Sequence, residues 1–462
     1  MIIEDLYTNG KLITPEALKY VEENNLSIDK LLNLKINLIK KEDLQENLQV
    51  EIKRERKKII SEEYEIDLKI NNYYVKHKER KTSDFLNYFN SRFSLIQKML
   101  IKRMSPISIC NISKTSNDEI DIIGLVYEIR STSNGNKIIE LEDPTGRINC
   151  LILKNSNNSI FEESYNILKD EVIGARGYYK NNYFFINEII RPDIPITNKL
   201  PKLEVPLNAV FLSDLHVGSI DFLDNLFKKF INWIKSEECK DVKYIFIAGD
   251  LVDGIGIYLE QEKDLSVKDG KKQYELLAEY LSEIPEHIKI ITSPGNHDIV
   301  GNHEPQPTLE NTALSKLPNI IFGTNPCSIV LENRIKILMY HGYSYDDIIN
   351  DIQSIRQNGY KKPCLPMIEV LKRRHLAPIY GSSLVLPEDE DNLVIKEIPN
   401  IFHSGHLHTV GVDNYRNVLT INSGTFQART KYQERIGHIP HPGIFVKVNF
   451  QTMEYKLINL NN

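Results

Sequence analysis

The feature that most constrains the fold is an alternation of apolar strand-like runs and helical segments that begins after Pro206. Segments such as FLDNLFKKFINWIK and YELLAEYLSEI have helical spacing, and they separate runs typical of buried strands: AVFLS, YIFIA, IKIITSP, IKILMY and IPNIFHS. This alternation predicts an α/β domain over residues 207–462. In open α/β sheets, binding sites lie at the carboxyl ends of the strands, so the residues after each run deserve the closest reading.

Five short polar motifs follow these runs. They are Asp214-Leu215-His216, Gly249-Asp250, Gly295-Asn296-His297-Asp298, His341-Gly342 and Gly405-His406-Leu407-His408. Eleven of the twelve histidines lie in this part of the chain, so histidine is concentrated where the strand ends can converge. Any one of these motifs is weak, but five in succession, each after a strand-like run, predict a single dinuclear metal site.

The residue types explain what such a site can do. Two divalent metals about 3.5–4 Å apart can activate a water and hold the attacking and leaving oxygens of a phosphoryl displacement. A shared carboxylate lowers the repulsion between the cations, and neutral imidazole and amide groups complete the ligand shells. Mixed oxygen and nitrogen ligands without thiolates suit Mn²⁺, with Fe²⁺ or Zn²⁺ as alternatives. We therefore expect metal-assisted hydrolysis of a phosphate ester.

The rest of the chain divides by texture into two further predicted domains. Residues 118–195 contain five short strand-like runs with an Asn134-Gly135 hairpin signal, which predicts a small barrel of the OB type. Its aromatic residues either stack on bases or fill the barrel, and filling is the preferred interpretation: Tyr178, Tyr179, Tyr183, Phe184 and Phe185. Residues 1–105 predict a charged helical module. It includes a solvated helix at EIKRERKKIISEE and an apolar stripe over 85–100 that should pack on a neighbouring element.

Composition limits the setting in which this chemistry can occur. The net charge of −6 means that any nucleic-acid contact must come from local basic patches. The five cysteines are scattered without a Cys-x-x-Cys pair, which indicates a reducing, intracellular environment. The N-terminus has no signal-peptide pattern, and no apolar run approaches the roughly 20 residues of a membrane span. We expect a cytoplasmic, nucleoid-associated protein with no membrane partner.

The motif series SDLHVGS, AGDLVDG, SPGNHD, MYHGYSYDDI and SGHLHTVG resembles the calcineurin-like metallophosphoesterases. With the barrel region and the stretches LKRRHLAPIYGSS and NVLTINSGTFQARTKYQ, the chain is similar to the small-subunit family of archaeal family-D DNA polymerases over about residues 80–462. The resemblance implies a two-sheet α/β sandwich behind an OB barrel. It also implies a 3′–5′ exonuclease acting on single-stranded or frayed 3′ ends of DNA, and a platform for a large catalytic polymerase subunit.

The resemblance also implies a role for each motif residue. One metal would be held by Asp214, His216 and His408, and a second by Asn296, His341 and His406, with Asp250 bridging the two. His297 would not be a ligand but would assist the leaving oxygen, and Asp298 would orient its imidazole.

Two other functions stay open on the sequence alone: a catalytically silent scaffold subunit of the same family, and a stand-alone repair nuclease of the same fold. The complete set of ligand positions argues against the first, and the barrel region argues against the second. Two further predictions concern single segments. His403 reads as a packed strand histidine, whereas the run Arg373-Arg374-His375 either faces DNA phosphate or the large subunit, or forms surface salt bridges.

Overall fold

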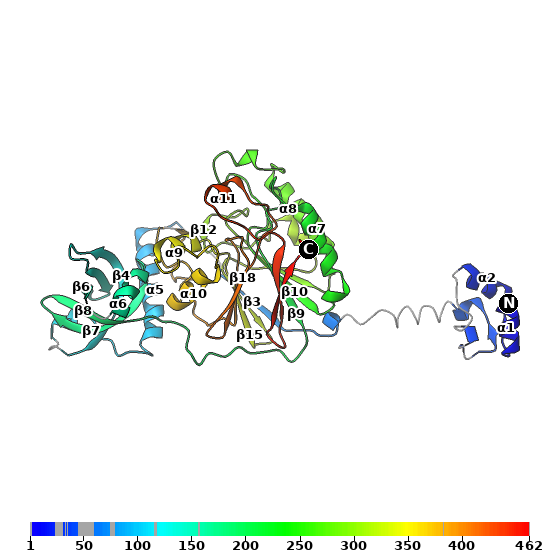
Figure 1. Ribbon diagram of the computed structural model, residues 1–462, viewed down its shortest axis with the longest axis horizontal. Coiled ribbons are helices and arrows are strands. Elements are labelled where there is room, and N and C mark those ends of the chain that lie inside the picture. Colours follow the sequence, from blue (N-terminus) through cyan, green and yellow to red (C-terminus); the bar gives the residue numbers. More distant parts are fainter. Residues whose placement is uncertain are drawn as a thin grey trace. The chain divides into compact units, whose positions relative to one another are not determined.

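The computed structural model contains two separate compact units, residues 1–60 and 61–462 (Figure 1). It describes residues 2–23, 31–32, 34, 36–44, 60–73, 79–114, 118–155, 158–381 and 383–461. The helix predicted at EIKRERKKIISEE lies largely outside these ranges, because only residues from 60 onward are described there. None of the helices in the described ranges is long and apolar enough to cross a membrane.

The first unit is a small helical module with its own apolar core. Its elements are α1 (Ile2–Thr8), β1 (Leu12–Ile13), α2 (Pro15–Glu23) and β2 (Leu38–Ile39), with β1 and β2 paired in parallel. Leu6, Ala17, Val21 and Ile39 are buried against one another. This module is therefore smaller than the predicted span of residues 1–105, and the domain boundaries drawn from the sequence stay predictions.

Two six-stranded sheets form the centre of the second unit, in agreement with the predicted α/β sandwich. The first has the order β13-β11-β10-β9-β20-β21, and its strands are β9 (Asn208–Leu212), β10 (Val242–Ala248), β11 (Lys289–Ser293), β13 (Ile320–Phe322), β20 (Ile444–Asn449) and β21 (Tyr455–Asn459). The second has the order β18-β19-β17-β15-β14-β3, and its strands are β3 (Leu68–Asn72), β14 (Cys327–Leu331), β15 (Ile335–Met339), β17 (Ile401–Ser404), β18 (Gly411–Tyr415) and β19 (Val418–Asn422). β9, β10, β11 and β13 run parallel, as do β15, β17 and β19.

Strand alternation explains why both sheet faces are apolar. Successive side chains point to opposite faces, so on β9 Ala209 and Phe211 enter the core between the sheets while Val210 and Leu212 face helices. The helices α7 (Asp224–Ile234) and α8 (Gly270–Ser282) cover the outer face of the first sheet. The helices α9 (Tyr345–Asp351) and α10 (Cys364–Arg373) cover the outer face of the second (Figure 1). Central strands such as β9 are thus buried on both sides, which accounts for their continuous apolar runs in the sequence.

Three short elements stand apart from the two main sheets. A two-stranded parallel pair joins β12 (His303–Glu304) and β16 (Leu384–Val385). The short helix α11 (Lys431–Arg435) begins at Thr430, whose side chain accepts a hydrogen bond from the Gln433 backbone amide. This capping bond holds α11 beside the carboxyl ends of the strands, where it lines a cleft.

A closed five-stranded barrel precedes the sandwich, as the sequence predicts. Its strands are β4 (Ile120–Ser131), β5 (Lys137–Asp143), β6 (Gly146–Ile152), β7 (Val172–Lys180) and β8 (Tyr183–Ile190), in the closed order β4-β5-β6-β8-β7. The helix α6 (Asn158–Glu163) lies between β6 and β7 in the chain. Phe184 is fully buried in the barrel core, and Tyr178 and Phe185 stack on each other at 5.1 Å between ring centroids. Packing in the barrel core accounts for Phe184, and stacking on each other accounts for Tyr178 and Phe185.

The helix α5 (Thr82–Leu100) fastens the barrel to the sandwich. Its apolar stripe packs on barrel strands β4 and β7, which confirms the predicted packing role. On the other side, the buried guanidinium of Arg92 forms a 2.8 Å ion pair with Asp391, and Arg92 also donates to the backbone oxygens of Asp170 and Pro378. Because each of these groups is desolvated, removing one partner would leave an uncompensated buried charge.

The run Arg373-Arg374-His375 belongs to the same interface, so the prediction of surface salt bridges is wrong. Arg373 forms a buried ion pair with Glu171 at 2.9 Å, and His375 contacts Asp391 at 2.8 Å. Arg374 instead donates to the backbone oxygens of Ile395 and Lys396 and lines a groove. Burial was the unforeseen element, because a charged run on a helix end normally faces solvent.

Candidate metal centre

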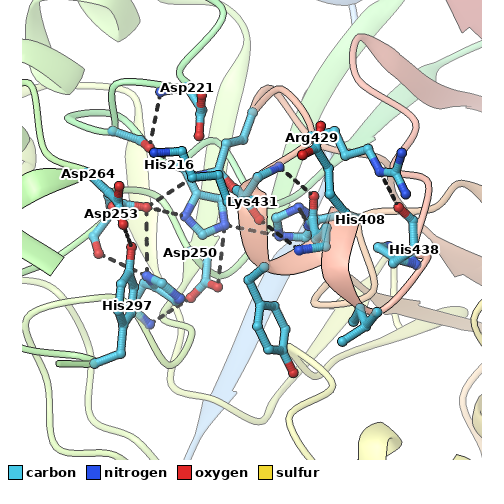
Figure 2. Close-up of a pocket in the computed structure, with 18 of the residues that line it drawn as sticks. His216, Asp221, Asp250, Asp253, Asp264, His297, His408, Arg429, Lys431 and His438 are labelled. Carbon is cyan, nitrogen blue, oxygen red and sulfur yellow. Dashed lines mark hydrogen bonds and ion pairs between the residues drawn. The ribbon is translucent and has the colours of Figure 1, made fainter. Parts of the chain in front are cut away.

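All of the predicted site residues lie just beyond the carboxyl ends of five strands from the two sheets. Asp214 follows β9, Asp250 follows β10, and Asn296 with His297 follows β11. His341 follows β15, and His406 with His408 follows β17. Because neighbouring strands in each sheet run parallel, their loops meet at one edge and line a cleft of about 720 Å³ (Figure 2).

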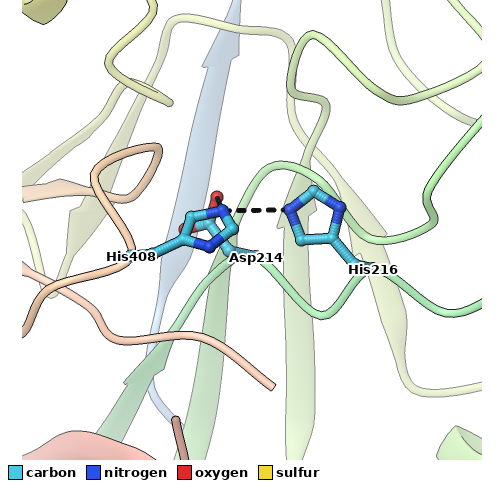
Figure 3. Close-up of side chains that lie close together, drawn as sticks. All are labelled: Asp214, His216 and His408. Carbon is cyan, nitrogen blue, oxygen red and sulfur yellow. Dashed lines mark hydrogen bonds and ion pairs between the residues drawn. The ribbon is translucent and has the colours of Figure 1, made fainter. Parts of the chain in front are cut away.

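Asp214, His216 and His408 form the first group of candidate ligands. Figure 3 shows the two imidazoles facing each other, with 3.1 Å between their Nε2 atoms, and the Asp214 carboxylate behind them. Asp214 Oδ1 lies 3.4 Å from His408 Nε2. The three ligand atoms are within 4.8 Å of one another and buried, so one cation could contact all of them.

Asp250, His341 and Asn296 form a second group beside the first. His341 Nδ1 lies 2.9 Å from the Ala248 carbonyl oxygen, which can only accept, so that nitrogen carries the proton. His341 Nε2 lies 3.0 Å from Asn296 Oδ1 and 3.3 Å from Asp250 Oδ2. A proton or a metal ion on Nε2 would satisfy these oxygens, and this oxygen and nitrogen donor set fits a divalent metal.

The Asp250 carboxylate has the position expected of a bridge. Its Oδ2 atom lies 3.3 Å from His341 Nε2 and 3.7 Å from His216 Nε2, one imidazole from each group. Its Oδ1 atom accepts a 2.8 Å hydrogen bond from the His297 backbone amide, which fixes the carboxylate plane. Asp250 therefore contacts both groups of candidate ligands.

His406 has a different arrangement from the other candidate ligands. Its ring lies 5.2 Å from the His341 ring between centroids, but its Nε2 atom contacts Asp346 Oδ2 at 3.0 Å. Only Nδ1 is left to face the second group. Its backbone amide also donates to both oxygens of Asp214, at 3.1 and 3.0 Å, so His406 helps to hold a ligand of the first group.

The orientation of His297 corrects one expectation. His297 Nδ1 contacts the backbone oxygen of Asp253 at 2.9 Å, whereas Asp298 does not touch the ring. The Asp298 carboxylate instead accepts hydrogen bonds from Tyr274 at 2.6 Å and from the Gly295 backbone amide at 2.8 Å. The prediction that Asp298 orients the His297 imidazole is therefore wrong. The Asp298 side chain points toward Tyr274 and Gly295, which precede it in the chain, and it stabilises the loop that carries His297.

Asp253 is the residue that sequence reasoning missed. Its Oδ1 atom lies 2.9 Å from His216 Nδ1, which turns His216 Nε2 toward the metal centre, and its backbone oxygen holds His297. Asp253 is the second carboxylate of the motif AGDLVDG, three residues after Asp250, so the sequence did contain a signal. Asp346 beside His406 and Gln433, 3.1 Å from His408 Nδ1, complete the supporting groups.

Backbone conformation marks the site as specialised. Five of the candidate ligands have φ between +50° and +66°, a left-handed conformation that is unfavourable for any residue except glycine. They are Asp214, His216, Asp250, His406 and His408. The glycines before them provide space as well. A Cβ atom at Gly405 would meet the Asp214 carboxylate, and one at Gly249 would meet the His341 ring. The Gly-Asp and Gly-His pairs are thus required by close packing of the loops.

The electrostatics of the site favour a bound positive charge. Burial disfavours the charged form of His341, but the Asp250 carboxylate outweighs it and raises the pKa of His341 to about 10. In the same way, burial disfavours the charged form of His216, but the hydrogen bond that His216 donates to Asp253 outweighs burial and raises the pKa of His216 to about 9. Burial lowers the pKa of His297, which is therefore neutral at pH 7.

His403 is the bystander that the sequence predicts. It is fully buried between the sheets, where it contacts Phe211 edge-on and the Ser423 hydroxyl at 2.9 Å. Burial lowers the pKa of His403 to about 3, so it is neutral throughout the physiological range. Packing accounts for this histidine.

Large exposed apolar side chains surround the cleft. Tyr258 is 46% exposed, Leu259 95% and Tyr432 63%, and all three line the same opening as the candidate ligands. Tyr432 belongs to α11, whose Lys431 and Arg435 also line the opening; Figure 2 shows Lys431. Exposed aromatic and cationic groups together suit a ligand that carries both bases and phosphates.

Comparison with known proteins gives two concordant results. Residues 207–416 match the calcineurin-like phosphoesterase family. The chain is 43% identical over 371 residues to the DNA polymerase II small subunit of Archaeoglobus fulgidus, which covers 78% of this chain and 74% of that one. The corresponding protein of Methanothermobacter thermautotrophicus is 40% identical over 78% of this chain and 76% of its own length. That of Thermoplasma acidophilum is 35% identical over 96% and 89%.

Proposed function

Because the chain belongs to the family of DNA polymerase II small subunits and carries a calcineurin-like phosphoesterase domain, we propose that it removes nucleotides from the 3′ ends of DNA. The observation that carries this proposal is the complete set of strand-end ligands around Asp250. A silent scaffold would have no need of five ligand residues held at positive φ.

The proposed ligand sets follow the two groups. Asp214, His216 and His408 would hold one cation, Asn296, His341 and His406 Nδ1 the other, and Asp250 would bridge them. The oxygen and nitrogen donor set suits Mn²⁺, with Fe²⁺ or Zn²⁺ as alternatives. When bound, two such ions supply an activated water and neutralise charge on the phosphate.

The protein's own groups would orient and protonate the substrate. Since His297 Nδ1 donates to the Asp253 carbonyl, the Nε2 atom of the neutral ring carries a lone pair and would face the reacting phosphate as a proton acceptor. It would take the proton that the attacking water releases and, once protonated, deliver that proton to the departing 3′-oxygen. Tyr258 and Tyr432 would stack on the unpaired terminal bases, which favours single-stranded or frayed ends over closed duplex.

The barrel would serve as part of a platform for the large catalytic polymerase subunit. Its strand order, with a short helix between the third and fourth strands, supports the OB type. The buried Arg92–Asp391 ion pair supports a rigid joint between barrel and sandwich, as a platform requires. A DNA substrate would place the protein in the cytoplasm with the nucleoid. The platform role and the nuclease activity are compatible.

The test is degradation of 5′-labelled DNA, either single-stranded or as a primer with a 3′ mismatch, in the presence of Mn²⁺. We expect stepwise shortening from the 3′ end by the wild-type chain and none by Asp250→Ala. Glu434→Ala is the matched control, because Glu434 lines the same cleft and no contact joins its side chain to a candidate ligand among the residues that the structure describes. Equal products from wild type and Asp250→Ala would leave only the scaffold function.

A further inference from the structure

A second recess lies at the other end of the same strands. It is a groove of about 1190 Å³ bordered by the end of α5, the segment after the barrel, the start of β15 and the approach to β17. Lys336 lies at the start of β15 and His341 just beyond its end. Five residues of strand at about 3.3 Å each put roughly 17 Å between the groove and the metal centre, so the two are distinct.

The lining of this groove is strongly basic. Eight of its side chains are lysine or arginine and only two are carboxylates, although the chain as a whole carries a net charge of −6. Four of these cations are neutralised locally: Lys336 pairs with Glu397 at 2.7 Å, Arg416 with Asp193 at 2.9 Å, Lys396 with Glu390 at 2.6 Å and Arg334 with Glu204 at 2.9 Å. Lys102 and Lys199 are exposed and form no ion pair with the residues that the structure describes. The excess positive charge is therefore available to a ligand.

Arg374 gives the groove a buried cation that forms no salt bridge with any residue in the described ranges. Its side chain is only 5% exposed, and its Nε and Nη2 atoms donate to the backbone oxygens of Ile395 and Lys396 at 2.9 Å each. Burial, with a contribution from neighbouring Arg103, lowers the pKa of Arg374 to about 10. A guanidinium in this state is stabilised by an incoming anion, and its planar fork matches phosphate oxygens.

Apolar groups line the groove beside the cations. Met99, Ile398 and the 82% exposed Ile196 contribute to it, together with prolines 192, 195 and 201. An apolar wall next to phosphate-binding groups suits the sugars and unpaired bases of a single strand better than the uniformly charged exterior of a duplex. An acidic protein segment would satisfy the charges but would make less use of the apolar lining.

We propose that this groove binds the phosphate backbone of a single-stranded nucleic acid, as a second contact separate from the metal centre. This proposal rests on the proposed function and extends it. A DNA strand bound in the groove would keep the protein on the DNA while the 3′ end of the DNA frays. The groove does not depend on the nuclease chemistry, since none of its lining residues contacts a candidate metal ligand within the described ranges.

The test is binding of fluorescein-labelled dT20 by the full chain, measured by anisotropy in EDTA so that the metal centre contributes no chemistry. The double variant Lys102→Glu/Lys199→Glu reverses the two exposed cations. Each contact to a single-strand phosphate makes the plot of log K against log salt concentration steeper by about 0.7. Between 1 M and 0.1 M salt, one contact therefore increases the affinity by about fivefold. We therefore expect a Kd about 25-fold weaker and a slope smaller by about 1.4.

The matched control is Lys316→Glu/Lys456→Glu, which changes the same charge at exposed lysines outside both the groove and the cleft. It should change the Kd less than twofold. Hydrolysis of a thymidine 5′-phosphate nitrophenyl ester should be equal in all three proteins, which separates failure of the groove from failure of the nuclease. Equal DNA affinity of the two double variants would overturn the proposal. So would unchanged DNA affinity with lost binding of polyglutamate, which would assign the groove to an acidic protein partner.

Discussion

Replacing Asp253 by asparagine tests how the metal centre is held together. Asp253 is 2% exposed, and its carboxylate accepts the 2.9 Å hydrogen bond from His216 Nδ1 that turns Nε2 toward Asp214 and Asp250. The amide keeps the shape and one acceptor oxygen but loses the negative charge. Because a charge-assisted hydrogen bond is about twice as strong as a neutral one, the loss is about 1.5 kcal/mol, close to a tenfold change in affinity.

The expected result is Mn²⁺ binding that is about 10- to 100-fold weaker at one of two sites, the usual range for groups that orient a metal ligand. Isothermal titration calorimetry of the metal-free chain measures it directly. Asp221→Asn is the matched control, since Asp221 lines the same cleft and no hydrogen bond joins its side chain to a candidate ligand among the described residues. Wild-type Mn²⁺ affinity in Asp253→Asn, or an equal loss in Asp221→Asn, would refute the reasoning.

Three further predictions concern the same region. His297→Ala should lower the nuclease rate at least about 100-fold while both metals stay bound, and loss of a metal in anomalous diffraction would show that His297 is a ligand. Gly405→Ala should destabilise the fold by about 1–3 kcal/mol in urea titrations and weaken metal binding, because the new methyl group meets the Asp214 carboxylate; an unchanged midpoint would contradict this. Burial raises the pKa of Glu304 from 4.5 to about 7, with partial opposition from the Tyr340 hydroxyl, so the folded state holds the proton more tightly than the unfolded state. Its stability contribution is complete below pH 4.5 and is lost as pH rises through 7, up to about 3 kcal/mol, whereas Glu304→Gln should show a flatter pH profile of thermal unfolding.

The contact between barrel and sandwich shows where sequence reasoning reached its limit. Arg92 lies 299 positions before Asp391 in the chain, but Arg92 and His375 are both buried within hydrogen-bond distance of Asp391. A charged residue in a sequence gives no sign that a distant partner will accompany it into the interior. Surface exposure was therefore the natural expectation for Arg373 and His375, and it was wrong.

The sequence by itself determined which residue types stand at which strand ends, because apolar runs specify buried strands and each motif follows one directly. It thereby predicted an α/β domain, the five-stranded barrel and the convergence of the candidate ligands, and it separated His403 from its neighbours His406 and His408. Only the tertiary structure decided which groups orient the imidazoles. Asp253 rather than Asp298 holds His297, and Asp346 holds His406, because loops from different strands approach one another at distances that spacing along one chain cannot convey.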